Sequence, residues 1–187
     1  MNNDELTRGG QKLVGALKAF KVSLKDKIVL DIGSSTGGFT AVALGQGARR
    51  VIAVEKGTRQ MRREIAMDLR VELHEKTDIF EFEMTEKPDV IVADVSFISL
   101  TKVLAYAKLE LIGRHTVCLV MLKPQFEVDA RGLNKGVIKS NRVRREVIEN
   151  FEGWLKRNGF VVLGKRDNEI AGRFGNIERF YYLKLEG

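Results

Sequence analysis

Short apolar runs alternate with amphipathic stretches along the whole chain. Each run is rich in β-branched residues and ends at a turn or a polar residue, which is typical of strands that are covered on both faces. The expected strands are Lys27–Gly33, Arg50–Glu55, Arg70–His74, Asp89–Val95, His115–Leu122, Phe160–Gly164 and Glu178–Leu185. The expected helices are Gly38–Gln46, Thr58–Met67, Ser99–Ile112 and Asn141–Asn158.

This order of elements predicts an α/β fold, a doubly wound and mostly parallel seven-stranded Rossmann-like sheet. No helical pattern separates Phe160–Gly164 from Glu178–Leu185, so we expect these two strands to pair antiparallel. Sheets of this kind bind ligands at the carboxyl ends of their strands. The chain has no internal repeat and no composition break, and residues 1–187 are expected to form one domain.

The composition describes a folded domain, because 44% of the 187 residues are hydrophobic and a single cysteine cannot form a disulfide within the chain. No apolar run approaches the ~20 residues of a membrane span, and the N-terminus lacks a signal-peptide pattern. We therefore expect a cytoplasmic protein without a membrane partner. The formal charge of +7 favours a polyanionic partner such as nucleic acid.

A glycine-rich turn follows the first expected strand. Its spacing, G-x-x-x-G-G from Gly33, differs from the G-x-G-x-x-G of dinucleotide-binding turns. Asp31 would repel a pyrophosphate, but it suits the cationic amino-acid end of S-adenosylmethionine. Glu55 can accept hydrogen bonds from ribose hydroxyls, and Asp78 can bind the adenine amino group. Each acid alone could equally be a cap, a strand end or a turn former. Together they predict a cofactor site made by Asp31, Gly33, Ser35, Gly37, Gly38, Phe39, Glu55, Asp78 and Asp94.

The residues after the fourth and fifth strands indicate the type of methyl transfer. Asp94-Val95-Ser96-Phe97 lacks the Pro-Pro pair expected for transfer to a base nitrogen, and Cys118 lies in an apolar run where it should be inert. The two histidines are isolated, so we expect no metal site. Lys123 ends a buried strand and can accept a hydroxyl proton, while Asp94 orients its ammonium. A lysine that simply reaches into water is the competing interpretation.

Five segments spread over residues 7–178 resemble one family. They are Thr7-Arg8-Gly9-Gly10-Gln11-Lys12-Leu13, Asp31-Ile32-Gly33-Ser34-Ser35-Thr36-Gly37-Gly38-Phe39-Thr40, Asp94-Val95-Ser96-Phe97-Ile98-Ser99-Leu100, Lys123-Pro124-Gln125-Phe126-Glu127 and Gly175-Asn176-Ile177-Glu178. The chain is similar to the TlyA-type methyltransferases, once labelled haemolysins, whose catalytic domain is shared with FtsJ-like ribose 2′-O-methyltransferases.

The resemblance implies a catalytic tetrad of Lys12, Asp94, Lys123 and Glu178. It also implies that S-adenosylmethionine is the donor and that a cytidine ribose of ribosomal RNA, free or in a subunit, is the acceptor. The family usually carries an N-terminal RNA-binding domain, which this sequence lacks. A further departure is Glu55-Lys56-Gly57, where the family commonly has Asp-Val-Gly, so that a longer side chain takes the ribose-binding role.

Several basic residues are expected to line the approach for RNA. The principal candidates are Arg8, Lys12, Lys139, Arg142 and Arg173, with Lys135, Arg144, Arg145 and Arg179 as further members. A solvated helix face is the competing interpretation, above all for Arg144 and Arg145. The glycine-containing stretch 126–139 predicts either a loop that closes over substrate or a plain connection.

Two other functions remain open from the sequence. One is an RNA-binding or ribosome-assembly module with a relict cofactor pocket, which the missing RNA-binding domain suggests. The other is a haemolysin-like membrane activity, for which the sequence offers no apolar span and no strongly amphipathic membrane helix.

Overall fold

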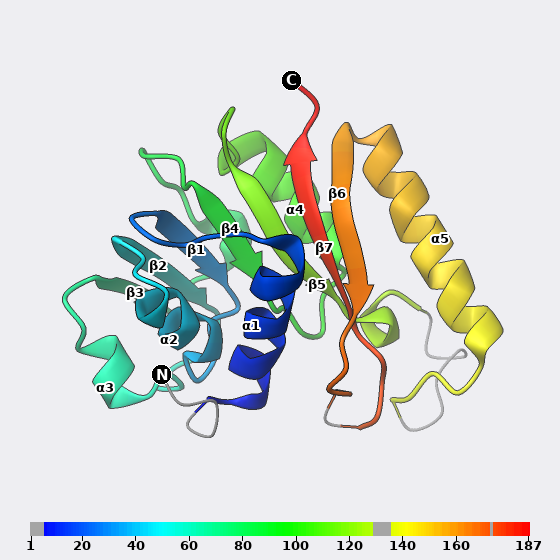
Figure 1. Ribbon diagram of the computed structural model, residues 1–187, viewed down its shortest axis with the longest axis horizontal. Coiled ribbons are helices and arrows are strands. Elements are labelled where there is room, and N and C mark those ends of the chain that lie inside the picture. The colour runs from blue at the N-terminus through cyan, green and yellow to red at the C-terminus, as the bar shows by residue number, and fades with distance from the viewer. Residues whose placement is uncertain (1–5, 129–135, 173) are drawn as a thin grey trace.

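The computed structural model describes residues 6–128, 136–172 and 174–187. Within these ranges the strands form one sheet in the order β3-β2-β1-β4-β5-β7-β6 (Figure 1). The strands are β1 (Ile28–Ile32), β2 (Arg50–Glu55), β3 (Val71–Glu75), β4 (Val90–Ala93), β5 (Val117–Leu122), β6 (Phe160–Asp167) and β7 (Arg179–Leu185).

The first five strands are parallel to one another, and β7 runs antiparallel between β5 and β6. The structure thus confirms the predicted seven-stranded, mostly parallel sheet and its antiparallel last strand. Every residue of β1 is buried, and β2, β4 and β5 are buried along almost their whole length. Burial on both faces explains why these segments read as continuous apolar runs.

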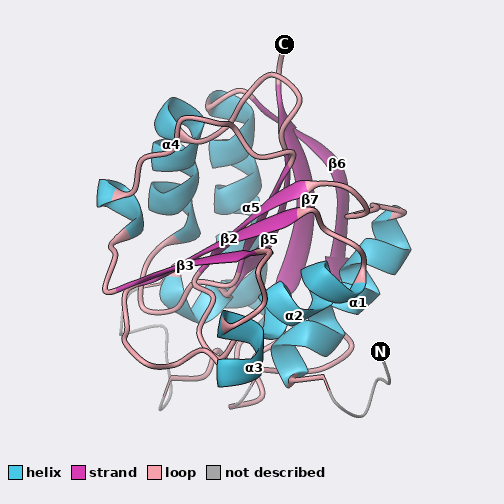
Figure 2. Ribbon diagram, turned by 90° about the vertical axis from the view of Figure 1, so that its left-hand side faces the viewer, coloured by secondary structure: helices cyan, strands magenta, loops and turns pink. Residues whose placement is uncertain are grey.

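Helices cover both faces of the sheet (Figure 2). Helices α4 (Leu100–Glu110) and α5 (Asn141–Arg157) pack on one face, with the short 3-10 turn η2 (Ile79–Glu81). Helices α1 (Arg8–Phe20), α2 (Gly38–Gly45) and α3 (Arg63–Ala66) pack on the other. A second 3-10 turn, η3 (Pro124–Phe126), follows β5. The two cores meet only through the sheet.

Two helices differ from the prediction. The stretch Thr58–Met67 was expected to be one helix, but only the four residues of α3 are helical. The Glu75 carboxylate accepts hydrogen bonds from the backbone N–H groups of Arg59 and Gln60, and Arg59 has a φ of 52°. These contacts hold the first part of the stretch in a loop, because a helix needs negative φ at every position.

Helix α1 was not among the expected elements. It begins after Thr7, whose side chain accepts a hydrogen bond from the Gly10 N–H, and it buries Leu13, Ala16 and Leu17. This helix brings Lys12 to the carboxyl edge of the sheet.

Candidate active site

The glycine turn after β1 forms one wall of the site. Gly33 has a φ of 80°, and a Cβ atom there would lie 3.0 Å from the backbone oxygen of Asp94. The residue must therefore be glycine for β1 and β4 to end side by side. The turn leads into α2, where the Gly37 N–H is bound by the Ser34 carbonyl oxygen at 2.8 Å.

A cavity of about 600 Å³ opens beside this turn at the carboxyl edge. Five of the nine predicted cofactor residues line it: Gly33, Ser35, Glu55, Asp78 and Asp94. The remaining lining residues include apolar side chains from the strand ends and from η2: Ile32, Val54, Ile79, Phe80, Val95 and Ile98. A cavity with apolar walls and a few acidic groups fits a nucleoside that carries hydroxyl and amino groups.

Glu55 ties the two loops of this wall together. One carboxylate oxygen accepts from the Ser35 N–H at 2.8 Å, and the other accepts from the Gly57 N–H at 2.7 Å. Asp78 accepts a hydrogen bond from the Lys56 ammonium at 2.8 Å and another from the Phe80 N–H. The bond from Lys56 is the main reason that the pKa of Asp78 is lowered. Both acids are held as oriented acceptors facing the cavity.

The other four predicted cofactor residues do not line the cavity. Phe39 is buried and packs on Phe180, with ring centroids 6.0 Å apart. A Cβ on Gly37 would lie 2.9 Å from Ile65, and one on Gly38 would lie 2.2 Å from the Thr7 hydroxyl. These glycines are needed for close packing of the turn against α1 and α3, whatever ligand the turn binds.

Asp31 is fully buried beneath the turn. Its Oδ2 accepts a hydrogen bond from the Thr40 hydroxyl at 2.6 Å, whereas Oδ1 has no partner within the described residues. Burial raises the pKa of Asp31 to about 7, and the negative charge of Asp94 adds to the effect. Asp31 therefore sits close to the balance between its neutral and charged forms at physiological pH.

Lys123 and Asp94 form an ion pair at the ends of β5 and β4. The Lys123 Nζ atom lies 2.5 Å from Asp94 Oδ1 and donates to the Ser96 hydroxyl at 2.8 Å. Only 12% of the Lys123 side chain is exposed. The lysine therefore points toward the cavity wall and not into water, and its ammonium is held in one direction by two oxygens.

A second ion pair joins α1 to the start of β7. Lys12 Nζ lies 2.5 Å from Glu178 Oε2, and both side chains are nearly inaccessible to solvent. The pair stands next to the first one, since a Cβ on Gly9 of the same helix would lie 3.6 Å from Asp94 Oδ2. The structure thus brings Lys12, Glu178, Asp94 and Lys123 to one corner of the site.

Phe97 was not predicted as a site residue. Its side chain is 91% exposed at the cavity wall, its φ is 64°, and its ring lies 5.1 Å from that of Phe126. A large, exposed aromatic side chain on a backbone with positive φ is unusual for a residue other than glycine. The sequence signal was the aromatic after Asp94-Val95-Ser96, but its exposure could not be read from a pattern that resembles a strand end.

The basic residues that were expected to contact RNA differ in their surroundings. Lys139 and Arg142 are exposed near the start of α5, and Arg8 donates to the Ala171 carbonyl at 2.6 Å. Arg144 and Arg179 both bind the Asp167 carboxylate at 2.6 Å, and their guanidinium groups join α5 to β6 and β7. Lys135 and Arg173 lie outside the described residues, as does half of the predicted loop 126–139.

The remaining chemical groups give no alternative centre. Burial raises the pKa of the Cys118 thiol to about 12, which keeps it from acting as a nucleophile. No group of three or more His, Cys, Asp or Glu side chains in the described ranges could hold a metal ion. In the described part of the chain, no helix combines the length and the apolar composition that crossing a membrane requires.

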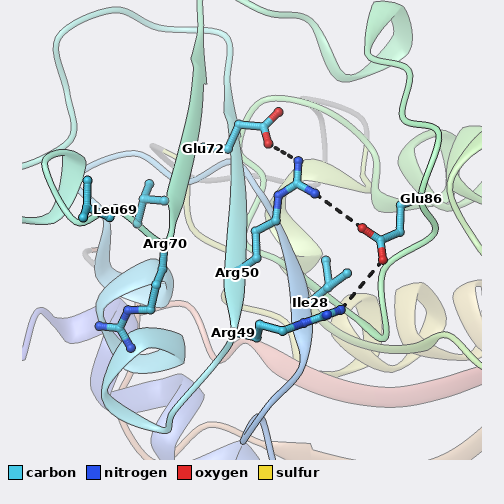
Figure 3. A pocket seen from close by; sticks show the side chains of 8 residues that line it. Ile28, Arg49, Arg50, Leu69, Arg70, Glu72 and Glu86 are labelled. Carbon is cyan, nitrogen blue, oxygen red and sulfur yellow. Dashed lines mark hydrogen bonds and ion pairs between the residues drawn. The ribbon is translucent and has the colours of Figure 1, made fainter.

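Another cavity, of about 360 Å³, lies at the opposite, amino edge of the sheet (Figure 3). Its arginines are committed to carboxylates: Arg50 binds Glu72 and Glu86, and Arg49 lies 3.7 Å from Glu86. Arg70 lies in the same wall and binds Asp68. With its cations paired, this cavity offers no free anion site, and the carboxyl edge is the candidate active site.

The fold and this edge define the class of S-adenosylmethionine-dependent methyltransferase folds. A solved methyltransferase of that class from Mesorhizobium loti has the same fold, with a TM-score of 0.65 at 12% identity over 90% of this chain and 95% of that one. The family model described as FtsJ-like methyltransferase matches residues 6–185, and the chain belongs to this family.

Two relatives are about one third identical to this chain in sequence. The 23S rRNA (cytidine-2′-O)-methyltransferase TlyA of Campylobacter jejuni is 34% identical over 95% of this chain and 70% of its own length. A solved structure from Streptococcus thermophilus, described as a hemolysin, has a TM-score of 0.92 and 35% identity over 100% of this chain and 69% of that one. The chain spans 66–74% of the length of the curated relatives it matches.

Proposed function

We propose that the protein is an S-adenosylmethionine-dependent methyltransferase that modifies the 2′-hydroxyl of a cytidine in ribosomal RNA. The family and the fold support the methyl transfer and its donor, and the relative from Campylobacter jejuni supports the acceptor. In this proposal the whole chain acts as one catalytic domain in the cytoplasm, and the reaction needs no metal ion. Its substrate is ribosomal RNA, either free or within a subunit.

The donor fits the cavity at the carboxyl edge. Glu55 and Asp78 are oriented acceptors for ribose hydroxyls and an adenine amino group, and the apolar walls suit the flat base. Gly33 and Ser35 bring backbone close to the ligand. The unpartnered Oδ1 of Asp31 supplies a buried negative group beneath the turn, consistent with a positively charged ligand nearby. When bound, S-adenosylmethionine supplies a methyl group on a positively charged sulfur, ready for transfer to an oxygen.

Lys123 is the proposed base. It must lose its proton to Asp94 or to solvent before it can accept the proton of the ribose hydroxyl, and the Ser96 hydroxyl then keeps the amine pointed at the acceptor. Asp94 stabilises the ammonium that forms. Lys12 is placed to contact the ribose or its phosphate, and Glu178 holds Lys12 in position.

The target nucleotide needs an exposed surface to lie on. Phe97 lines the cavity and its ring is tilted by 49° against that of Phe126, and aromatic side chains of this kind stack on unpaired RNA bases. Lys139 lies exposed near the start of α5, where it is available for phosphates, and Arg142 is exposed close to it but pairs with Glu146 at 3.2 Å.

The observation that carries the proposal is the Lys123–Asp94 pair at 2.5 Å beside the cavity wall. Its test is methyl transfer from labelled S-adenosylmethionine to unmethylated small and large ribosomal subunits, with and without EDTA, followed by mapping of alkali-resistant linkages. Lys123→Met should lower the rate by about 10²-fold or more. Its binding of S-adenosylmethionine, measured by calorimetry, should stay within about 3-fold of the parent.

Lys27→Met is the matched control, because Lys27 is also a strand-end lysine in an ion pair, 3.4 Å from Asp89 at the opposite edge. This variant should keep the parent rate. Full activity in Lys123→Met would refute the assigned base. Binding of RNA without binding of S-adenosylmethionine, and with no methyl transfer by the parent protein, would favour an RNA-binding module instead.

A further inference from the structure

The loop between β6 and β7 carries Glu178 at its last position. It is held from several elements: the Asn168 N–H donates to the Glu178 carbonyl at 2.9 Å, Arg8 of α1 donates to the Ala171 carbonyl, and Arg144 of α5 donates to the Ile177 carbonyl at 3.3 Å. These hydrogen bonds fix the conformation of the β6–β7 loop, and the loop in turn sets the position of Glu178.

Asn176 joins this loop to another segment of the chain. It is 5% exposed, and its side chain reaches a segment that lies about 40 residues earlier in the chain. Its Oδ1 accepts from the Ile138 N–H at 3.0 Å, and its Nδ2 donates to the Gly136 carbonyl at 3.0 Å. The oxygen and the nitrogen of the side-chain amide thus both bind the backbone of residues 136–138. They supply one acceptor and one donor, as the backbone of a neighbouring strand would.

The backbone of Asn176 shapes the loop around Glu178. Its carbonyl accepts from the Gly172 N–H at 2.8 Å, and this bond closes a turn across the loop. A Cβ on Gly172 would lie 2.7 Å from Glu178 Oε1. The glutamate carboxylate therefore rests directly on the turn that Asn176 closes, and its other oxygen binds Lys12.

We infer that Asn176 is a positioning residue: its side chain docks residues 136–138 against the β6–β7 loop and thereby fixes the Glu178–Lys12 pair. The inference rests on the proposed function, because Glu178 matters for the reaction only if the tetrad does. The same docking places Lys139 and the start of α5 next to the catalytic corner, since both follow residue 138 directly. An apolar replacement would leave the Ile138 N–H and the Gly136 carbonyl without these partners.

The test compares Asn176→Ala with Asn168→Ala. Asn168 lies in the same loop, and its side-chain amide makes only a weak contact with Met121 sulfur at 3.1 Å. Hydrogen exchange of peptides that cover residues 136–140 reads the docking directly. Methyl transfer to ribosomal subunits reads the consequence for Glu178, and calorimetry reads S-adenosylmethionine binding. Thermal unfolding shows whether each variant is folded.

In Asn176→Ala we expect faster exchange at residues 136–140 and a kcat that falls about 10- to 100-fold. The Kd for S-adenosylmethionine should change by less than about 3-fold, since the residue lies outside the cofactor cavity. Asn168→Ala should change neither exchange at 136–140 nor kcat. Asn176→Asp keeps the acceptor for Ile138 but places an oxygen against the Gly136 carbonyl, so it should restore only part of the exchange protection.

Unchanged exchange in Asn176→Ala would overturn the docking. Faster exchange with a parental kcat would overturn the positioning role while leaving the proposed function intact. If the parent protein itself transferred no methyl group, the proposed function would fail, and the exchange result alone would then decide whether Asn176 docks the segment. A general loss of stability is recognised by a lowered unfolding temperature together with a raised Kd for S-adenosylmethionine, and that combination would also count against a specific role.

Discussion

Of three acidic side chains at the carboxyl edge, two are paired with a lysine and one is not. Asp94 is paired with Lys123, Glu178 is paired with Lys12, and Asp31 has only the Thr40 hydroxyl. A buried carboxylate without a cation favours the neutral form, because the protein interior solvates charge poorly. Asp31 is therefore the residue whose charge state should respond to pH and to a cationic ligand.

This difference predicts how stability depends on pH. Burial raises the pKa of Asp31 from 3.8 to about 7. Between pH 3.8 and about 7 the native state keeps a proton that the unfolded chain has lost. Raising the pH across this range therefore lowers the free energy of unfolding, by roughly 4 kcal/mol in total. Urea unfolding of the parent and of Asp31→Asn between pH 4 and 8.5 measures it. The parent should lose stability relative to the variant up to about pH 7, with no further change above that. Parallel curves for the two proteins would contradict the assignment.

Much of the site could be predicted from residue types at strand ends. Gly33, Glu55, Asp94 and Lys123 follow buried runs, and parallel strands bring such positions to one edge. The interpretation of Gly38 and Phe39 as ligand contacts came from the same turn, but in the structure their environment is protein. The spacing of residues along the sequence does not reveal tertiary packing of this kind. Lys12 and Glu178 could be paired only through the family pattern, because they lie 166 positions apart.

At the scale of elements, the contact between α1 and α2 depends on glycine. A Cβ on Gly10 would lie 3.1 Å from the Gly38 carbonyl oxygen, and one on Gly38 would overlap the Thr7 hydroxyl at 2.2 Å. The two helices approach closely at their N-terminal ends, which is how α1 brings Lys12 to the site. The strands were predictable from their apolar runs, whereas this crossing was not, since it depends on which residues of distant segments face each other.

The crossing can be tested by a pair of substitutions. Gly38→Ala should lower the free energy of unfolding by about 1–3 kcal/mol, because the added methyl group overlaps Thr7. Thr7→Ala alone should cost about 1 kcal/mol through loss of the helix cap. In the Gly38→Ala background the Thr7→Ala change should cost less or even stabilise, because it removes the overlapping hydroxyl. Urea titrations of the four proteins measure this coupling, and strictly additive effects would show that the helices do not meet as described.

At the scale of the whole molecule, the two edges of the sheet differ in chemistry. The carboxyl edge carries the cavity of about 600 Å³, both lysine–carboxylate pairs and the exposed Phe97. The cavity of about 360 Å³ at the amino edge carries arginines that are neutralised by Glu72 and Glu86. RNA should therefore approach one edge only, and basic residues at that edge should carry the salt dependence of binding.

Lys139 and Lys25 test this polarity, because both are exposed lysines and Lys25 precedes β1 at the amino edge. Lys139→Ala should raise KM for ribosomal RNA and reduce the slope of log KM against log salt concentration by about 1. Lys25→Ala should leave both unchanged. Steady-state methylation between 50 and 200 mM salt, on the order of the range over which phosphate contacts weaken strongly, is the measurement. Equal effects of the two substitutions would place the RNA elsewhere.

The ion pair between Lys12 and Glu178 also has a consequence for the synthesis of the protein on the ribosome. Residue 12 leaves the ribosome before residue 178 and before β7, the strand that lies between β5 and β6. The Lys12–Glu178 pair therefore cannot form until residue 178 has been synthesised. The proposed catalytic corner stays incomplete until then, so we expect no methyl transfer to RNA before that point.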